Sequence, residues 1–142
     1  MKTSARNQWP GKVVSVHLGA VTAEVLVALT GGTEIVANIS VDSARRMGLE
    51  HGREVVVLVK APMVLLALDL EGFVVSARNQ LAGEISEIKL GPVTADVTLK
   101  LEGGDTVTAS ITSESCQTLG LAIGKTAIAL FKAGAVILAT RV

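Results

Sequence analysis

The chain has 142 residues, and its 13 Lys plus Arg balance 13 Asp plus Glu, so no overall field attracts nucleic acid or anionic lipid and any anion site must be local. Hydrophobic residues make up 49% of the sequence, but no uninterrupted apolar run of about 18 residues could span a bilayer, so we expect the surplus in subunit interfaces. The single cysteine excludes an internal disulfide, and the polar start Met1–Gln8 lacks the apolar core of a secretory signal, which predicts a cytoplasmic protein.

The sequence contains one module twice. Ser4–Gln8 returns letter for letter as Ser76–Gln80, an offset of 72 positions, and the same offset aligns the rest of the chain without a gap. A repeat is read as one structural unit per copy, so we expect two domains, residues 1–70 and residues 71–142. Units of about 70 residues are near the lower size at which a lone core suffices, and they usually need a partner.

The first half of each copy predicts three strands. Apolar residues at 13, 16 and 18 and at 85, 88 and 90 indicate a first strand, whose three-residue step predicts a bulge near Val14-Ser15. Alternating apolar residues over Thr22–Leu29, and over the same positions of the second copy, predict a half-buried second strand. Gly31-Gly32 and Gly103-Gly104 then predict a tight hairpin, after which alternation resumes from Ile35 and from Val107.

The second half of each copy predicts a short helix and two more strands. The helices cover Asp42–Met47 and Glu114–Leu119, with Ser40 and Thr112 as N-caps and glycine stops at 48 and 120. Apolar runs then predict strands over 55–59 and 63–68, and over 127–131 and 135–139. This order predicts an all-β protein of two tandem OB-like five-stranded barrels, each with one short helix between strands 3 and 4. The connecting segment 69–75 is partly apolar, so we expect it to be packed.

Several hydrogen-bond donors recur that a barrel does not need. They are Ser4/Ser76, Arg6/Arg78, Ser40/Thr112, Ser43/Ser115 and Lys60/Lys132. A set of cations and hydroxyls suits an anion that only accepts hydrogen bonds, as a fully deprotonated tetrahedral oxyanion does. Phosphate keeps a proton and would benefit from an acceptor, so this interpretation requires the repeated acids Asp42 and Glu114 to point outward. Ordinary surface charges and an ordinary helix cap remain the alternative.

The stretches Thr3–Gly11, Ile39–Ser43, Gly48-Leu49 and Val59–Pro62 resemble those of the Mop-domain molbindins. Two such domains in tandem, with no room for a DNA-binding or ATPase module, resemble the di-Mop intracellular molybdate-binding proteins. The resemblance implies a homotrimer of OB-like barrel pairs that binds, stores and buffers molybdate, and tungstate, at subunit interfaces. It implies no enzymatic activity, no cofactor, no membrane or nucleic-acid partner, and no metal held directly by side chains.

The resemblance also implies the site residues. In the first copy they are Ser4, Arg6, Ser40, Ser43, Lys60 and Ala61, the last through its backbone N–H; in the second they are Ser76, Arg78, Thr112, Ser115, Lys132 and Ala133. Pro62 becomes Gly134, so the two classes of site are expected to be unequal. The family also implies a site on the threefold axis, for which the candidates are Gly19, Val21, Thr22, Gly91, Val93 and Thr94.

Two other functions remain as alternatives. OB barrels often bind single-stranded nucleic acid by stacking bases on aromatic rings in a basic groove. Here Trp9, Phe73 and Phe131 are the only aromatic residues, none recurs in the other copy, and the net charge is zero. A molybdenum-pterin complex in place of the free oxyanion is the second alternative. No nucleophile–base pair or acid pair recurs, which argues against an enzyme.

Overall fold

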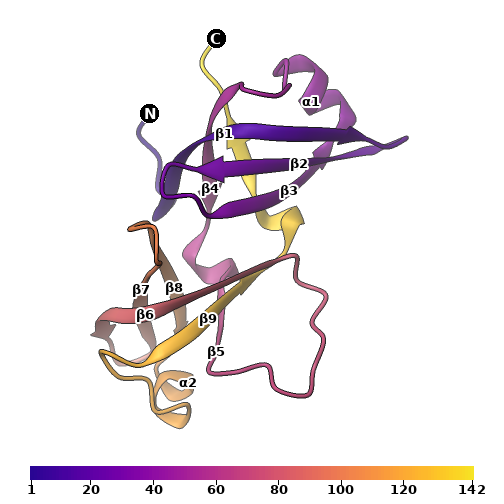
Figure 1. Cartoon of the computed structure of the whole chain (residues 1–142). Helices are drawn as coiled ribbons and strands as arrows, with labels where there is room; N and C mark the ends of the chain where they lie inside the picture. The colour runs from indigo at the N-terminus through magenta and orange to yellow at the C-terminus, as the bar shows by residue number, and fades with distance from the viewer.

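The structure, a computed structural model, describes all of residues 1–142, which form two antiparallel sheets of five strands with a short helix beside each (Figure 1). The predicted fold class is confirmed. The elements of the first copy are β1 Asn7–Leu18, β2 Thr22–Leu29, β3 Glu34–Ser40, α1 Val41–Arg46, β4 Glu54–Val59, the 3-10 turn η1 Ala61–Met63 and β5 Leu65–Ala67. Those of the second copy are β6 Asn79–Leu90, β7 Thr94–Lys100, β8 Thr106–Thr112, α2 Ser113–Thr118, β9 Thr126–Phe131, η2 Ala133–Ala135 and β10 Ile137–Ala139.

The long first strand of each copy bends because it belongs to two strand pairs. Residues Asn7–Lys12 of β1 pair with β4, and Gly11–Leu18 pair with β2. The register shifts between Val13 and Ser15, which confirms the predicted bulge, and β6 shifts at the equivalent place. A bulge increases the local twist, so the sheet curls around the side chains on its inner face.

The short helices begin and end as their sequences predict. The Ser40 hydroxyl accepts from the Ser43 N–H at 3.0 Å, and the Thr112 hydroxyl accepts from Ser115 N–H at the same distance. Both helices end before a glycine with a positive φ, 60° at Gly48 and 62° at Gly120, which a side chain would strain. The N-cap hydroxyls are thereby placed at the point where the third strand of each sheet ends.

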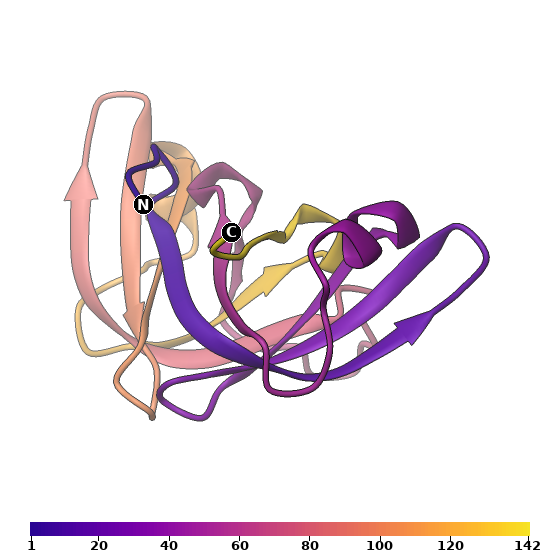
Figure 2. The same cartoon turned by 90° about the horizontal axis from the view of Figure 1, so that it is seen from above.

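The fifth strand of each sheet comes from the other copy. The first sheet has the order β10-β4-β1-β2-β3, and the second has the order β5-β9-β6-β7-β8. Leu138 pairs with Val57 of the first half, and Leu66 pairs with Ala129 of the second. Figures 1 and 2 show the yellow C-terminal segment among the purple elements of the first half. Each sheet is therefore completed by a strand that lies across the predicted boundary between the copies.

One contiguous cluster of 29 buried hydrophobic residues runs through both halves, and the C-terminal segment contributes Leu138 of β10 and Val136, just before that strand. The expectation of a packed connecting segment is wrong: Phe73 is 79% exposed and Val74 is fully exposed. The cores are already closed by the exchanged strands, so this segment loops away from both sheets (Figure 1). None of the helices has the length and hydropathy needed to cross a membrane.

Candidate oxyanion site

Each arginine of the repeated motif pairs with an acid of the other half. Arg78 donates from Nη1 and Nη2 to the two carboxylate oxygens of Glu24 on β2, at 2.9 and 3.0 Å. Arg6 Nη1 lies 2.6 Å from Asp96 Oδ2 on β7. These hydrogen bonds are the main cause that lowers the pKa of Glu24 and of Asp96, and slight burial opposes the shift. Both carboxylates are therefore ionised at neutral pH.

Sequence reasoning missed these acids, although positions 24 and 96 are acidic in both copies at the same offset of 72 as the arginines. It considered Asp42 and Glu114 instead, and required them to point outward. The structure agrees with that requirement: the Asp42 side chain is 82% exposed and bonds to Arg46 at 3.1 Å, and Glu114 is exposed. The acceptors nearest to the arginines are thus on the neighbouring sheet rather than on the helices.

The asparagine and glutamine of the motif have structural roles. Asn7 is buried and bonds the backbone of Thr108 in the other half twice, through Thr108 N–H to Oδ1 at 2.8 Å and through Nδ2 to Thr108 O at 2.9 Å. Asn79 makes the same two bonds with Val36, at 2.8 and 2.9 Å. Gln8 Nε2 donates to Ala5 O at 2.8 Å, which holds the segment before β1 in a turn.

The register of the strands places the motif beside the lysine of its own half and directs it toward the hydroxyl pair of the other. Asn7, the first residue of β1, pairs with Val59, the last residue of β4. Arg6 and Lys60, the next residues beyond these two strand ends, therefore lie side by side. Trp9 donates a hydrogen bond to Thr106 O of β8, and Asn7 donates one to Thr108 O two residues further on. Arg6 contacts Asp96, which pairs across the strands with Ser110 of β8. The motif therefore runs antiparallel along β8 toward its end at Thr112, the N-cap of α2, whose first turn holds Ser115.

The second copy repeats this arrangement on the first. Asn79 pairs with Phe131, so Arg78 lies beside Lys132, and Asn79 bonds β3, the strand that ends in Ser40. The turns that begin with the lysine-alanine pairs also lie on the opposite half, η1 against β8 and η2 against β3. The backbone therefore directs the motif and the lysine-alanine turn of each half toward the strand of the other half that ends in the hydroxyl pair.

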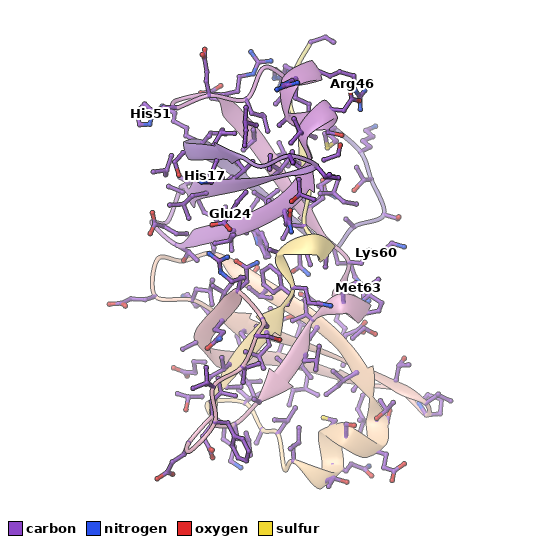
Figure 3. All side chains as sticks on the ribbon, turned by 90° about the vertical axis from the view of Figure 1, so that its right-hand side faces the viewer. His17, Glu24, Arg46, His51, Lys60 and Met63 are labelled. Atoms are coloured by element: carbon purple, nitrogen blue, oxygen red, sulfur yellow. The ribbon has the colours of Figure 1, made fainter.

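Within each hydroxyl pair the side chains already touch. Ser40 Oγ lies 2.9 Å from Ser43 Oγ, and Thr112 Oγ1 lies 2.8 Å from Ser115 Oγ. Arg46, which has no basic counterpart in the second copy, donates to Ser43 Oγ at 3.3 Å. Most of the charged and hydroxylic donors are solvent-exposed, namely Ser4, Arg6, Ser40, Lys60, Ser76, Arg78, Thr112, Ser115 and Lys132; Ser43 is half-buried, and Ala61 and Ala133 are buried. Figure 3 shows Lys60 projecting from the side of the molecule at the level where the two halves meet.

The turns proposed for a threefold-axis site are exposed hairpin turns. Gly19 N–H donates to Thr22 O at 2.8 Å, and Gly91 repeats this bond to Thr94 at 2.9 Å. A Cβ on either glycine would lie 2.8 Å from the threonine carbonyl, so the turn itself requires glycine there. Val21 and Val93, at the tips, are 76% and 73% exposed, which is unusual for large apolar side chains that recur in both copies.

The arginine–carboxylate pairs give the chain a small acid dependence of stability. A carboxyl whose pKa is lowered in the folded state stabilises that state above its unfolded pKa, about 4, and loses this contribution as the pH falls through the folded value. We expect the Glu24→Gln, Asp96→Asn double variant to unfold at lower urea concentration than the wild type at pH 7, with the difference shrinking as the pH falls from about 5 to about 3. A difference that stays constant over this range would contradict the assignment of the two pairs.

Comparison with known proteins places both copies in one family of domains. Residues 3–66 and residues 75–138 each match the TOBE domain. The solved structure of the cytoplasmic molybdate-binding protein ModG with molybdate bound has a TM-score of 0.96 and 46% sequence identity, and the similarity covers 99% of this chain and 100% of that one.

Relatives with longer chains match this chain along about half of their own length. The molybdenum transport protein ModE of Herbaspirillum seropedicae is 43% identical over 141 residues, which are 99% of this chain and 52% of that protein. The molybdenum-pterin-binding protein MopA of Rhodobacter capsulatus is 46% identical over 139 residues, 98% of this chain and 52% of that protein. The chain thus spans about half the length of these relatives.

Proposed function

Because the chain belongs to the TOBE-domain family, with one such domain in each half, we propose that it binds molybdate and tungstate and that it stores and buffers these oxyanions in the cytoplasm, without catalysis. The observation that carries the proposal is the likeness to molybdate-bound ModG along the whole of both chains, at 46% identity. A likeness of this extent includes the segments that hold the recurring donors.

The proposed chemistry is multivalent donation to a dianion. Guanidinium, ammonium and hydroxyl groups all donate hydrogen bonds, and those from charged groups are about twice as strong as neutral ones. We assign one class of site to Ser4, Arg6, Lys60 and Ala61 with Thr112 and Ser115 of the other half, and a second class to Ser76, Arg78, Lys132 and Ala133 with Ser40 and Ser43. The backbone N–H of each alanine completes the set. Gly134 in place of Pro62 makes the two classes unequal.

We further propose that the chain assembles as a homotrimer, which closes these sites. Exposed donors lose much of their strength to water, so a second surface must cover them to give tight binding. Apolar side chains that are exposed in matching pairs, Leu18/Leu90, Val21/Val93 and Leu65/Ile137, offer such a surface, since isolated barrels do not need them. A third class of site on the threefold axis, at the turns Gly19–Thr22 and Gly91–Thr94, belongs to the same proposal.

Titration calorimetry tests the proposal directly. We expect binding of molybdate and tungstate, much weaker binding of the smaller sulfate, and no binding of phosphate or of a single-stranded DNA control. Sedimentation equilibrium should give three times the mass of one chain, and bound oxyanion should raise the melting temperature by mass action. A monomer with no affinity for either oxyanion would refute the proposal.

A molybdenum-pterin ligand is the second candidate, because the name of the relative MopA specifies one. The two ligands differ in what remains with the purified protein. Metal analysis together with pterin fluorescence of the denatured protein should find molybdenum without an equal amount of pterin if the free oxyanion is the ligand. Equal amounts of both would favour the pterin complex.

A further inference from the structure

Both arginines proposed to bind the oxyanion are already bound to a carboxylate within the chain. Arg78 directs both terminal nitrogens at Glu24. These two nitrogens form the edge of the guanidinium that would bind an oxyanion through two parallel hydrogen bonds. Arg6 directs Nη1 at Asp96, whose pKa is lowered further by a hydrogen bond from Ser110. An oxyanion that reaches either arginine therefore meets a resident negative charge at the same donors.

The acids are not required by the barrel itself. They occupy the same position on β2 and β7, on the polar face of a strand whose alternate residues Ala23, Val25, Ala95 and Val97 fill the core. The side chains of the two pairs are between 35% and 54% exposed, so a ligand can reach them. The cross-strand neighbours differ, His17 opposite Glu24 and Lys89 opposite Asp96, while the arginine–acid contact is kept in both halves.

We infer that Glu24 and Asp96 set the oxyanion affinity of the two classes of site by competing with the ligand for Arg78 and Arg6. The inference rests on the proposed oxyanion binding, and it identifies Glu24 and Asp96 as the groups that limit the oxyanion affinity. Each arginine is held by its acid, so the oxyanion binds only to the extent that it displaces that acid or shares the arginine with it.

Competition outweighs the alternative, in which the acid helps by orienting its arginine. An ordered side chain reduces the entropy lost on binding, which raises the affinity by roughly two- to twelvefold. A negative charge about 6 Å from a dianion lowers the affinity by about tenfold even in bulk water, and by more where a covering surface excludes water. The two effects oppose each other, and the repulsion is the larger wherever the site is enclosed.

The direction of the affinity change tests the inference. Glu24→Gln keeps the shape and one acceptor oxygen but removes the charge, and Glu24→Ala removes both. We expect each to tighten molybdate binding, measured by calorimetry on the full chain, by about two- to fivefold at the class of site that contains Arg78. Asp96→Asn and Asp96→Ala should do the same at the class that contains Arg6. Glu71→Gln, a matched loss of charge in the exposed connecting segment, should leave both classes unchanged.

The other outcomes are equally decisive. A purely structural role for the pairs predicts unchanged or weaker binding together with lower stability, and that result in folded variants would overturn the inference while leaving the proposed function intact. Binding that is unchanged for glutamine and weaker for alanine would assign the acids to orientation and would also overturn it. A wild-type chain that binds no oxyanion would overturn the proposed function and the inference with it.

Discussion

Lys60→Ala and Lys132→Ala are each expected to weaken molybdate binding by about ten- to hundredfold at one class of site and to leave the other class nearly unchanged. Both lysines are exposed at the end of an apolar strand, where they contribute nothing to the core. Removing a hydrogen bond from a charged group costs about 1.5–3 kcal/mol, which corresponds to this loss of affinity. Calorimetry at several oxyanion concentrations separates the two classes.

The chain supplies a matched control for the lysine variants. Lys12 lies on β1 and is replaced by Glu84 in the second copy, so no repeated site includes it. Lys12→Ala removes the same charge and should change neither class. If all three variants lose affinity equally, the effect is due to net charge, and the assignment of the two lysines is wrong.

Asn79→Ala and Asn7→Ala are each expected to lower the free energy of unfolding by about 2–4 kcal/mol, because both amides are buried and satisfy two backbone groups of the opposite half. For a chain of this length such a loss lowers the melting temperature by roughly 5–15 °C. Asn79→Asp is nearly isosteric but cannot donate to Val36 O and places a negative charge against it. We expect it to destabilise at least as much as alanine.

Differential scanning calorimetry with Asn38→Ala as control checks these values, since Asn38 is exposed on β3 close to the strand position that Asn79 contacts. That control should shift the melting temperature by only a degree or two. If the Asn7 and Asn79 variants melt with the wild type, the contacts between the halves do not contribute to stability as the hydrogen bonds indicate.

Local features of the fold could be predicted because each depends on a few neighbouring residues. Alternation over Thr22–Leu29 depends on which face of a strand is buried, and the Ser40 cap depends on an N–H three residues later. The break in alternation at Val14 was also visible, because a bulge moves every later side chain to the opposite face. The exposed segment at Phe73 was predicted wrongly, because its apolar content says nothing about whether a surface is available to cover it.

The candidate site could be predicted only as a set of residue types. Recurrence separated Arg6, Lys60 and the hydroxyls from charges that change between copies, and an anion that only accepts hydrogen bonds followed from their chemistry. The acids at 24 and 96 recur as regularly, but they belong to an alternating strand pattern, where a polar residue on the outer face needs no other explanation. Their contact with the arginines spans 54 residues in one case and 90 in the other, and no local pattern reports such a distance.

The sequence by itself determined that this protein is two copies of one small barrel, with matching strands, caps and donors in each, because those features follow from neighbouring residues and from the repeat. Only the tertiary structure decided which copy completes which barrel. A fifth strand buries the same side chains whether it pairs within its own copy or with the other, since β4 and β9 present equivalent edges, so the pattern of residues is the same for both arrangements. What distinguishes them is the path of the chain through the η1 and η2 turns and the contacts across the halves, from Asn7, Asn79 and the two arginines, which exist only once the halves are assembled.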